Sequence, residues 1–203
     1  CPIDYAGGGG EEPAEHRVDF YAEWDFIETK WYRTGEPIEF PEPPVIEGKV
    51  FVSWNAKVDD EWIDTPQYMP DYDISIHASY TANTYKLVYK VDGEVVSETD
   101  VEYGTGIIAM EEPVKDGYTF SGWDNVPATM PAHDVEINGT FTINSYTVTF
   151  YVDEEEYHKE TVRYGDIIPL PTEPVKEGYT FSHWYGDLHY PTRMPSHDID
   201  TYA

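Results

Sequence analysis

The chain repeats one peptide pattern three times, and this repetition limits the folds that it can adopt. The stretch from Glu111 to Trp123 reads EEPVKDGYTFSGW, and TEPVKEGYTFSHW follows from Thr172 to Trp184. A weaker copy, PPVIEGKVFVSW, ends at Trp54. A chain with internal repeats builds the same small unit several times. We therefore predict three small modules in series rather than one large domain.

The three copies align without a gap from His16, Tyr85 and Tyr146 to their tryptophans. The recurring positions are glycines and aromatic residues: Gly48, Gly117 and Gly178; Phe51, Phe120 and Phe181; Trp54, Trp123 and Trp184. Each copy then closes with a tail that begins Met-Pro and contains an aspartate. We expect the repeated glycine to form a turn and the repeated aromatic residues to fill a core that every module must build.

The repeat boundaries follow from this alignment. We predict a flexible glycine-rich linker at 1–15, repeat 1 at 16–81 with an insert at 55–68, repeat 2 at 82–142 and repeat 3 at 143–203. The joints TANT and TINS have equal length and contain no Gly or Pro, so we expect fixed angles between neighbours rather than flexible tethers. The third copy lacks the final aromatic residue of the others, and we expect the natural chain to continue beyond Ala203.

Each copy shows the alternation of apolar and polar residues that is typical of β-strands. In repeat 2, Leu87 and Tyr89 point one way along YKLVYKV, and the Asp-Gly pair at 92–93 predicts a hairpin turn. We expect a third strand in GYTFSGW, with Phe120 and Trp123 on opposite faces, and a last strand in DVEINGTF. The Pro-rich stretch before the third strand leaves room for a short helix or an irregular crossover. The expected fold class is mainly β, or α+β where that helix forms.

The composition excludes several classes of partner. The net charge is −28, from 40 acidic and 12 basic residues. Such a negative field repels phosphate backbones and anionic lipid surfaces, so we expect no nucleic-acid partner. The single cysteine excludes an intrachain disulfide. No apolar run approaches the ~20 residues that span a bilayer, so we expect no transmembrane segment.

No sequence motif of a catalytic site occurs in the chain. It lacks G-x-S-x-G, H-E-x-x-H, C-x-x-C and the phosphate-loop lysine motif. We therefore expect no enzyme activity, no cofactor and no metal. Two metal alternatives stay open: the acidic stretch 59–73 offers carboxylates to calcium, and His183, His189 and His197 offer imidazoles to a transition metal. A solvated acidic loop and surface histidines are the simpler interpretations.

Repeat 1 carries aromatic residues that its sister repeats lack. Trp24, Phe26 and Trp31 align with Gly, Val, Glu, Asp or Thr elsewhere, and Trp62 lies in the insert. Positions that accept such residues in the sister copies are expected to face solvent. One interpretation is an exposed aromatic patch in repeat 1, which is a candidate site for a protein or sugar ligand. In the alternative interpretation, the insert folds over these residues and buries them as a private core.

Two sets of residues are candidates for covalent modification. Cys1 is a candidate for lipid attachment, followed by the flexible tether Gly7–Gly10, unless the chain is an excised fragment. Lys86 and Asn138 are candidates for an isopeptide cross-link between a first and a last strand. A structural cross-link should recur in every repeat, and the sister repeats do not carry this pair.

The phrase PVKDGYTFSGW, after a strand like YTVTFYV and a V-x-Y-G turn, resembles the Listeria–Bacteroides repeat, a family that includes the internalin-type B repeat. The resemblance covers repeats 2 and 3 well. Repeat 1 departs from it, with Lys49 in place of the Tyr and Ser53 in place of the Gly. The resemblance implies tandem β-grasp-like modules of about 60 residues, each with a short helix, on extracellular, cell-surface attached proteins. It implies no catalytic residues.

These observations predict a non-catalytic extracellular stalk or spacer on a bacterial surface, arranged as an elongated rod, with an adhesive role for repeat 1. The expected partner is a host or neighbouring-cell surface protein or glycan, and we expect flanking domains in a longer chain. Two alternatives stay open. One is a projecting fibre or decoration domain of a phage or filament, and the other is a carbohydrate-binding accessory module of a secreted enzyme.

Overall fold

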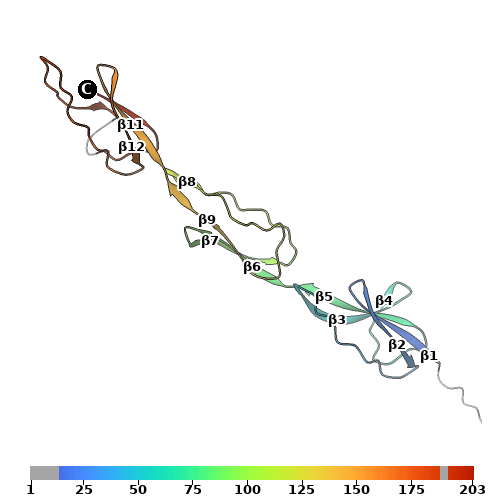
Figure 1. The fold of residues 1–203 in the computed structure, drawn as a ribbon. Coiled ribbons are helices and arrows are strands. Elements are labelled where there is room, and N and C mark those ends of the chain that lie inside the picture. Colours follow the sequence, from blue (N-terminus) through green and yellow to red (C-terminus); the bar gives the residue numbers. More distant parts are fainter. Residues whose placement is uncertain (1–13, 188–191) are drawn as a thin grey trace, which may run out of the picture. The chain divides into compact units, whose positions relative to one another are not determined.

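The computed structural model describes residues 14–187 and 192–203 (Figure 1). The strands in these residues form four sheets, and the described part of the chain contains no helix. The prediction of a mainly β fold is confirmed. Cys1, His189 and the predicted linker up to residue 13 lie outside the described residues. Strand β1 begins at Glu15, inside the stretch predicted as linker.

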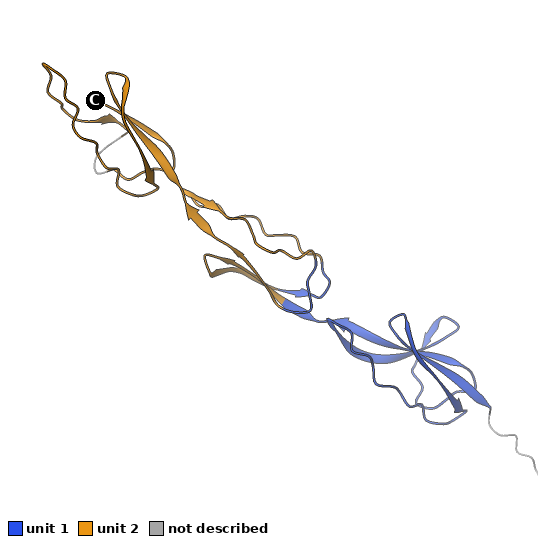
Figure 2. Cartoon of the chain, viewed as in Figure 1, with its two compact units in different colours: residues 1–85, 100–105, 129–133 blue, residues 86–99, 106–128, 134–203 orange. Residues whose placement is uncertain are grey.

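The chain divides into two compact units (Figure 2). Unit 1 holds residues up to 85 together with 100–105 and 129–133, and unit 2 holds 86–99, 106–128 and 134–203. The division therefore passes through repeat 2.

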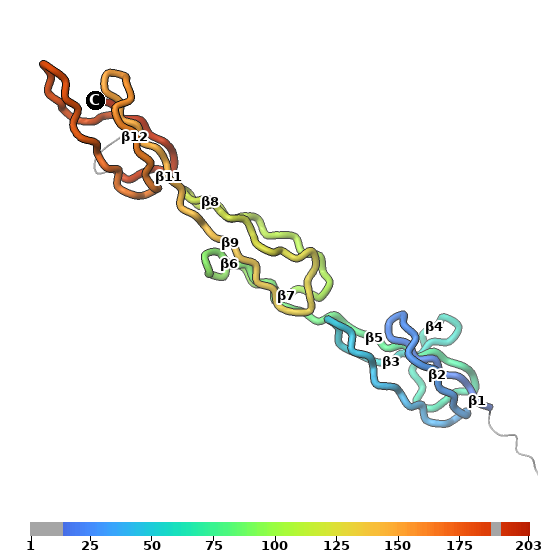
Figure 3. The backbone as a smooth tube through the Cα atoms, in the orientation of Figure 1, coloured from blue at the N-terminus to red at the C-terminus, as the bar shows by residue number. Residues whose placement is uncertain are grey.

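Unit 1 is built on one mixed sheet with the strand order β2-β1-β5-β3-β4. The strands are β1 (Glu15–Ala22), β2 (Asp25–Arg33), β3 (Lys49–Val58), β4 (Glu61–Ile63) and β5 (Ile74–Ala82). The last strand, β5, lies parallel to β1, and the other neighbours are antiparallel. A parallel pair such as β1 and β5 needs a long connection between its strands. Part of that connection is the crossover from β2 to β3, which is irregular backbone without a helix (Figure 3).

The core of unit 1 lies on one face of this sheet because apolar residues alternate along its strands. Val18 and Phe20 on β1 and Ile76 on β5 are fully buried, as the period of two predicts. The ring of Phe20 meets Trp54 edge to face at 5.7 Å between centroids. An edge-to-face pair of this kind adds about 0.5–1.5 kcal/mol beyond the burial of its area.

The insert of repeat 1 forms a hairpin. Strand β3 runs on to Val58, the chain turns at Asp59 and Asp60, and β4 returns beside it. Both turn residues have positive φ, of 47° and 69°. Aspartate tolerates this region better than most side chains do. The hairpin adds a fifth strand to the sheet instead of covering its outer face.

Unit 2 contains most of repeat 2 and all of repeat 3. The strands of repeat 2 are β6 (Thr84–Val91), β7 (Glu94–Glu102), β8 (Tyr118–Phe120), β9 (Val135–Gly139) and β10 (Phe141–Ile143), of which β6 and β7 extend into unit 1. Those of repeat 3 are β11 (Ser145–Val152), β12 (Glu155–Arg163), β13 (Tyr185–Gly186) and β14 (Ile199–Tyr202). The sheet orders are β7-β6-β9, β10-β8 and β12-β11-β14-β13. In both repeats the last strand again lies parallel to the first.

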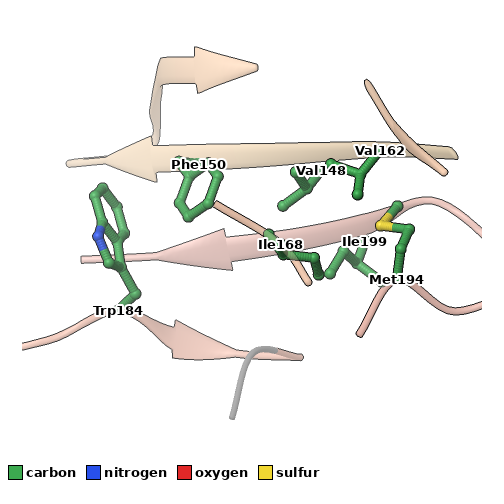
Figure 4. Packing of buried hydrophobic residues seen from close by; sticks show 7 residues of the cluster. All are labelled: Val148, Phe150, Val162, Ile168, Trp184, Met194 and Ile199. Carbon is green, nitrogen blue, oxygen red and sulfur yellow. The ribbon is translucent and has the colours of Figure 1, made fainter. Parts of the chain in front are cut away.

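The repeated aromatic residues pack together in each repeat, as predicted. Figure 4 shows the core of repeat 3, in which Trp184 lies next to Phe150 at one end of a cluster that also contains Ile168 and Ile199. The same ring contact recurs in all copies: Phe20–Trp54 at 5.7 Å, Tyr89–Trp123 at 4.9 Å and Phe150–Trp184 at 4.9 Å. The repeated peptide is therefore scaffold.

One prediction about the third strand is wrong. Trp123 does not lie on the opposite face from Phe120, because their rings meet at 5.0 Å. Strand β8 ends at Phe120, and Gly122 has a φ of +82°. This left-handed residue turns the chain, so the alternation of a strand no longer applies at Trp123.

The tail of each repeat holds the start of the first strand. A tail aspartate accepts a hydrogen bond from a backbone N–H in every copy: Arg17 to Asp73 at 2.8 Å, Lys86 to Asp134 at 2.8 Å and Thr147 to Asp198 at 2.7 Å. Because a strand end leaves backbone donors without a ladder partner, the aspartate recurs for a structural reason.

Candidate binding face of the first repeat

The outer face of the sheet in unit 1 lies opposite the core and carries aromatic and polar side chains in register. On β1, Tyr21 faces Phe26 of β2 on one side and His77 of β5 on the other. His77 in turn faces Asn55 of β3. Residues that face each other across neighbouring strands lie on the same side of a sheet. A row of side chains therefore crosses four strands.

The rings of this row touch one another. Phe26 meets Tyr21 edge to face at 5.7 Å, and Tyr21 stacks on His77 at 4.8 Å with 10° between the ring planes. Trp62 of β4 meets His77 edge to face at 5.4 Å. We call these four residues, Phe26, Tyr21, His77 and Trp62, the aromatic ladder.

The four aromatic residues singled out from the sequence are exposed. The exposed fractions are 96% for Trp24, 57% for Phe26, 61% for Trp31 and 63% for Trp62. The alternative in which the insert buries them as a private core is wrong, because the insert pairs edge-on with β3. Their role in binding stays a prediction.

The structure brings three of these four residues to one end of the face. Trp24 lies in the turn between β1 and β2, two residues before Phe26, and lines one hollow together with Trp62. Trp31 lies on the same face but faces Arg17, five residues along β2 from Phe26. At about 3.4 Å a residue, that places Trp31 roughly 17 Å away along the strand.

A hollow of about 430 Å³ opens between Trp24 and Trp62. Its polar lining includes Asn55, Lys57, His77 and Ser79. Ser79 and Ser53 share a hydrogen bond between their hydroxyls at 3.1 Å. The hollow thus combines two exposed indole rings with amide, imidazole and hydroxyl groups.

The charges around this hollow are largely paired. Lys57 Nζ donates to the Asp60 carboxylate at 2.8 Å and lies 5.6 Å from the centre of the Trp62 ring. The lysine lowers the pKa of Asp60. Burial, and then the charge of Lys57, lower the pKa of His77 below its usual 6.5. His77 is therefore neutral at pH 7 and presents one donor and one acceptor nitrogen; Nε2 lies 3.0 Å from the Ser75 hydroxyl.

Two residues of the ladder were missed from the sequence. Tyr21 aligns with Lys90 and Tyr151, and His77 aligns with Asn138 and Tyr202. The variability of these two columns was the available signal. Their proximity depends on the parallel pairing of β1 with β5, which joins residues 56 apart in the chain.

The other candidate chemistries find no support in the geometry. Within the described residues, no group of three His, Cys, Asp or Glu side chains lies close enough to hold a metal ion. Asn138 faces Lys90 and not Lys86 across β6 and β9, and the Lys86 amine contacts Glu98. No helix in the described part is long and apolar enough to cross a membrane.

Comparison with known proteins adds the family. The model of the Listeria-Bacteroides repeat domain matches residues 16–79, 85–142 and 146–203. Internalin H of Listeria monocytogenes is 36% identical over 138 residues, which is 59% of this chain and 24% of the relative. A putative membrane protein of Evansella cellulosilytica is 30% identical over 220 residues, which is 99% of this chain and 31% of the relative.

A putative Gly-rich membrane protein of the same organism is 31% identical over 159 residues, covering 70% of this chain and 18% of the relative. The chain thus spans less than a third of the length of these relatives. Three tandem matches account for nearly the whole described chain. The chain belongs to the Listeria-Bacteroides repeat family.

Proposed function

We propose that this chain is a non-catalytic spacer segment of a bacterial surface protein, in which three modules carry other domains away from the cell. The names of its relatives, an internalin and two putative membrane proteins, support a place at the cell surface. The parallel pairing of the first and last strands in each module supports a β-grasp-like assignment, in which an irregular crossover replaces the helix of that fold.

The observation that carries the proposal is a joint that is built twice in the same way. In unit 1, the ring of Tyr103 lies directly over Gly48, so that a Cβ at Gly48 would come within 2.2 Å of it. Asn83 connects the two segments: its N–H donates to the Gly48 carbonyl at 2.8 Å, and its own carbonyl accepts from the Tyr103 N–H at 2.9 Å.

Unit 2 repeats this arrangement between repeats 2 and 3. The ring of Tyr164 covers Gly117, where a Cβ would come within 2.3 Å of it. The Asn144 N–H donates to the Gly117 carbonyl, and the Tyr164 N–H donates to the Asn144 carbonyl, both at 2.9 Å. We call each set, Gly48, Asn83 and Tyr103 or Gly117, Asn144 and Tyr164, a glycine–tyrosine joint.

These joints support the expectation that TANT and TINS are not flexible tethers. Strand β5 ends at Ala82 and β6 starts at Thr84; likewise β10 ends at Ile143 and β11 starts at Ser145. One asparagine separates the strands each time, and both of its backbone groups are bonded. A tether with bonded backbone and a covered glycine keeps little of the freedom of a Gly/Ser linker, which suits a spacer.

Small-angle scattering of the whole chain tests the spacer proposal. A compact globule of this length would have a radius of gyration of about 17 Å. The spacer requires a clearly larger value that does not change with salt or protein concentration. A radius near that of a globule would refute the proposal.

A further inference from the structure

We propose that the hollow between Trp24 and Trp62 binds a neutral oligosaccharide, a site that goes beyond the spacer role. A pyranose ring has an apolar face of C–H groups and a rim of hydroxyls. The apolar face packs on exposed indole rings, and the hydroxyls need donors and acceptors beside those rings. The hollow supplies both kinds of group within one sheet.

The hollow holds both donors and acceptors for the hydroxyl groups of a sugar. Asn55 offers an amide, and Ser79 offers a hydroxyl that also hydrogen-bonds Ser53. Neutral His77 leaves Nδ1 for a ligand, because Nε2 lies 3.0 Å from the Ser75 hydroxyl. These three lining residues are half-buried and stand on the paired strands β3 and β5. Groups held on neighbouring strands of a sheet are more precisely placed than groups on loops.

The size of the hollow favours a small ligand over a protein. Its volume of about 430 Å³ falls within the ~300–1,000 Å³ that is typical of small-molecule sites. A stable protein partner buries roughly 1,200–2,000 Å² in total and needs an apolar centre. The lining of the hollow instead includes two charged residues, Glu23 and Lys57, which form ion pairs with Lys49 and Asp60.

The charge of the chain selects a neutral ligand among sugars. The net charge is −28, and Lys57, the cation that lines the hollow, already binds Asp60 at 2.8 Å. An anionic polysaccharide would meet a repelling field without a free cation in this lining. A neutral sugar meets no such penalty.

Repeat 2 does not carry this site, and in repeat 3 three tyrosines, Tyr151, Tyr202 and Tyr185, take the places of Tyr21, His77 and Asn55. In repeat 2 the equivalents of Tyr21, His77 and Asn55 are Lys90, Asn138 and Asp124. There, Lys90 forms an ion pair with Glu136 at 2.7 Å, and the Asn138 N–H donates to Asp124 at 2.6 Å. These contacts are structural, and no aromatic ring stands at those three positions. Trp62 comes from the insert that only repeat 1 carries in this chain.

Indole N–H signals of the full chain, labelled with ¹⁵N, test the proposal. The chain has six tryptophans and hence six such signals. Cellohexaose, N-acetylchitohexaose and mannohexaose, each titrated to about 5 mM, reveal binding with Kd values up to about 1 mM. We expect at least one of them to shift the Trp62 and Trp24 signals saturably and to leave the Trp31 signal in place.

Trp31→Ala is the matched control for Trp62→Ala, since both rings are about equally exposed on the same face. We expect Trp62→Ala to weaken binding at least tenfold and Trp31→Ala to change it less than twofold, with unchanged circular dichroism for both. Asn55→Ala supplies a second variant should Trp62→Ala lose its fold. Saturable shifts from none of the three sugars, equal loss in both tryptophan variants, or tighter binding of polygalacturonate would each overturn the proposal. None of these outcomes affects the scattering result, so the spacer proposal is tested independently of the sugar site.

Discussion

The glycine–tyrosine joint predicts how much one methyl group, added at its glycine, lowers the free energy of unfolding. Gly117 and Gly178 occupy the same position in repeats 2 and 3, with φ of +75° and +77°. Alanine at either site pays the left-handed backbone penalty of about 1–2 kcal/mol. At Gly178 no atom lies within 4 Å of the new Cβ, whereas at Gly117 the Tyr164 ring lies at 2.3 Å. Forced repacking around an inserted methyl group costs about 1–3 kcal/mol more.

We therefore expect Gly178→Ala to lower the free energy of unfolding by about 1–2 kcal/mol and Gly117→Ala to lower it by about 2–5 kcal/mol. Both residues belong to unit 2, so urea denaturation followed by near-ultraviolet circular dichroism compares them directly. In a Tyr164→Ala background the ring is gone, and Gly117→Ala should cost no more than Gly178→Ala. If both variants lost the same free energy of unfolding in the wild-type background, the predicted contact between Gly117 and Tyr164 would be refuted. The same holds if Gly117→Ala still cost more than Gly178→Ala after removal of the Tyr164 ring.

Three further predictions concern single contacts. Asp198→Ala should destabilise unit 2 by about 1–2 kcal/mol in urea unfolding, because the first strand of repeat 3 loses its acceptor, whereas Asp198→Asn should cost less. The hydrogen bond to Asp116 raises the pKa of the Tyr164 phenol above 10.0, so its stabilising effect is present below pH 10 and lost as pH rises through the folded-state pKa. Asp116→Asn should lower that pKa in an ultraviolet titration, and an unchanged value would contradict the contact. Lys57→Gln should raise the pKa of His77 towards 6.5, measured by nuclear magnetic resonance, without fully restoring it, since burial is the larger cause.

The core of each module could be predicted from the sequence because recurrence and alternation act together there. Phe20, Tyr89 and Phe150 occupy one column of the alignment and are all buried. Recurrence in all three repeats is by itself weaker evidence that a residue is buried. The valines of the repeated Pro-Val pair, Val45, Val114 and Val175, recur in all copies and are almost fully exposed, because they stand on irregular crossovers rather than on a strand with an inner face.

The joints and the ladder could not be predicted in the same way. Tyr103 and Tyr164 are visible in the sequence as the residues before a turn glycine, but each covers a glycine in the preceding repeat. His77 joins Tyr21 through a parallel strand pair. Both features depend on contacts between residues about 50 positions apart, which local patterns do not encode. The alignment pointed to the exposure of Trp24 and Trp31, because the sister repeats replace them with small or polar residues, whereas Trp62 in the insert has no counterpart there.

The most direct test of the spacer account is a set of residual dipolar couplings from repeats 2 and 3 in the weakly aligned full chain. If the joint at Gly117, Asn144 and Tyr164 is stiff, the strands β8 to β10 and β11 to β14 should fit one common alignment tensor. The Gly117→Ala and Tyr164→Ala variants should then require two tensors of different magnitude. Two independent tensors in the wild-type chain would contradict the account, since a freely moving joint cannot serve a spacer.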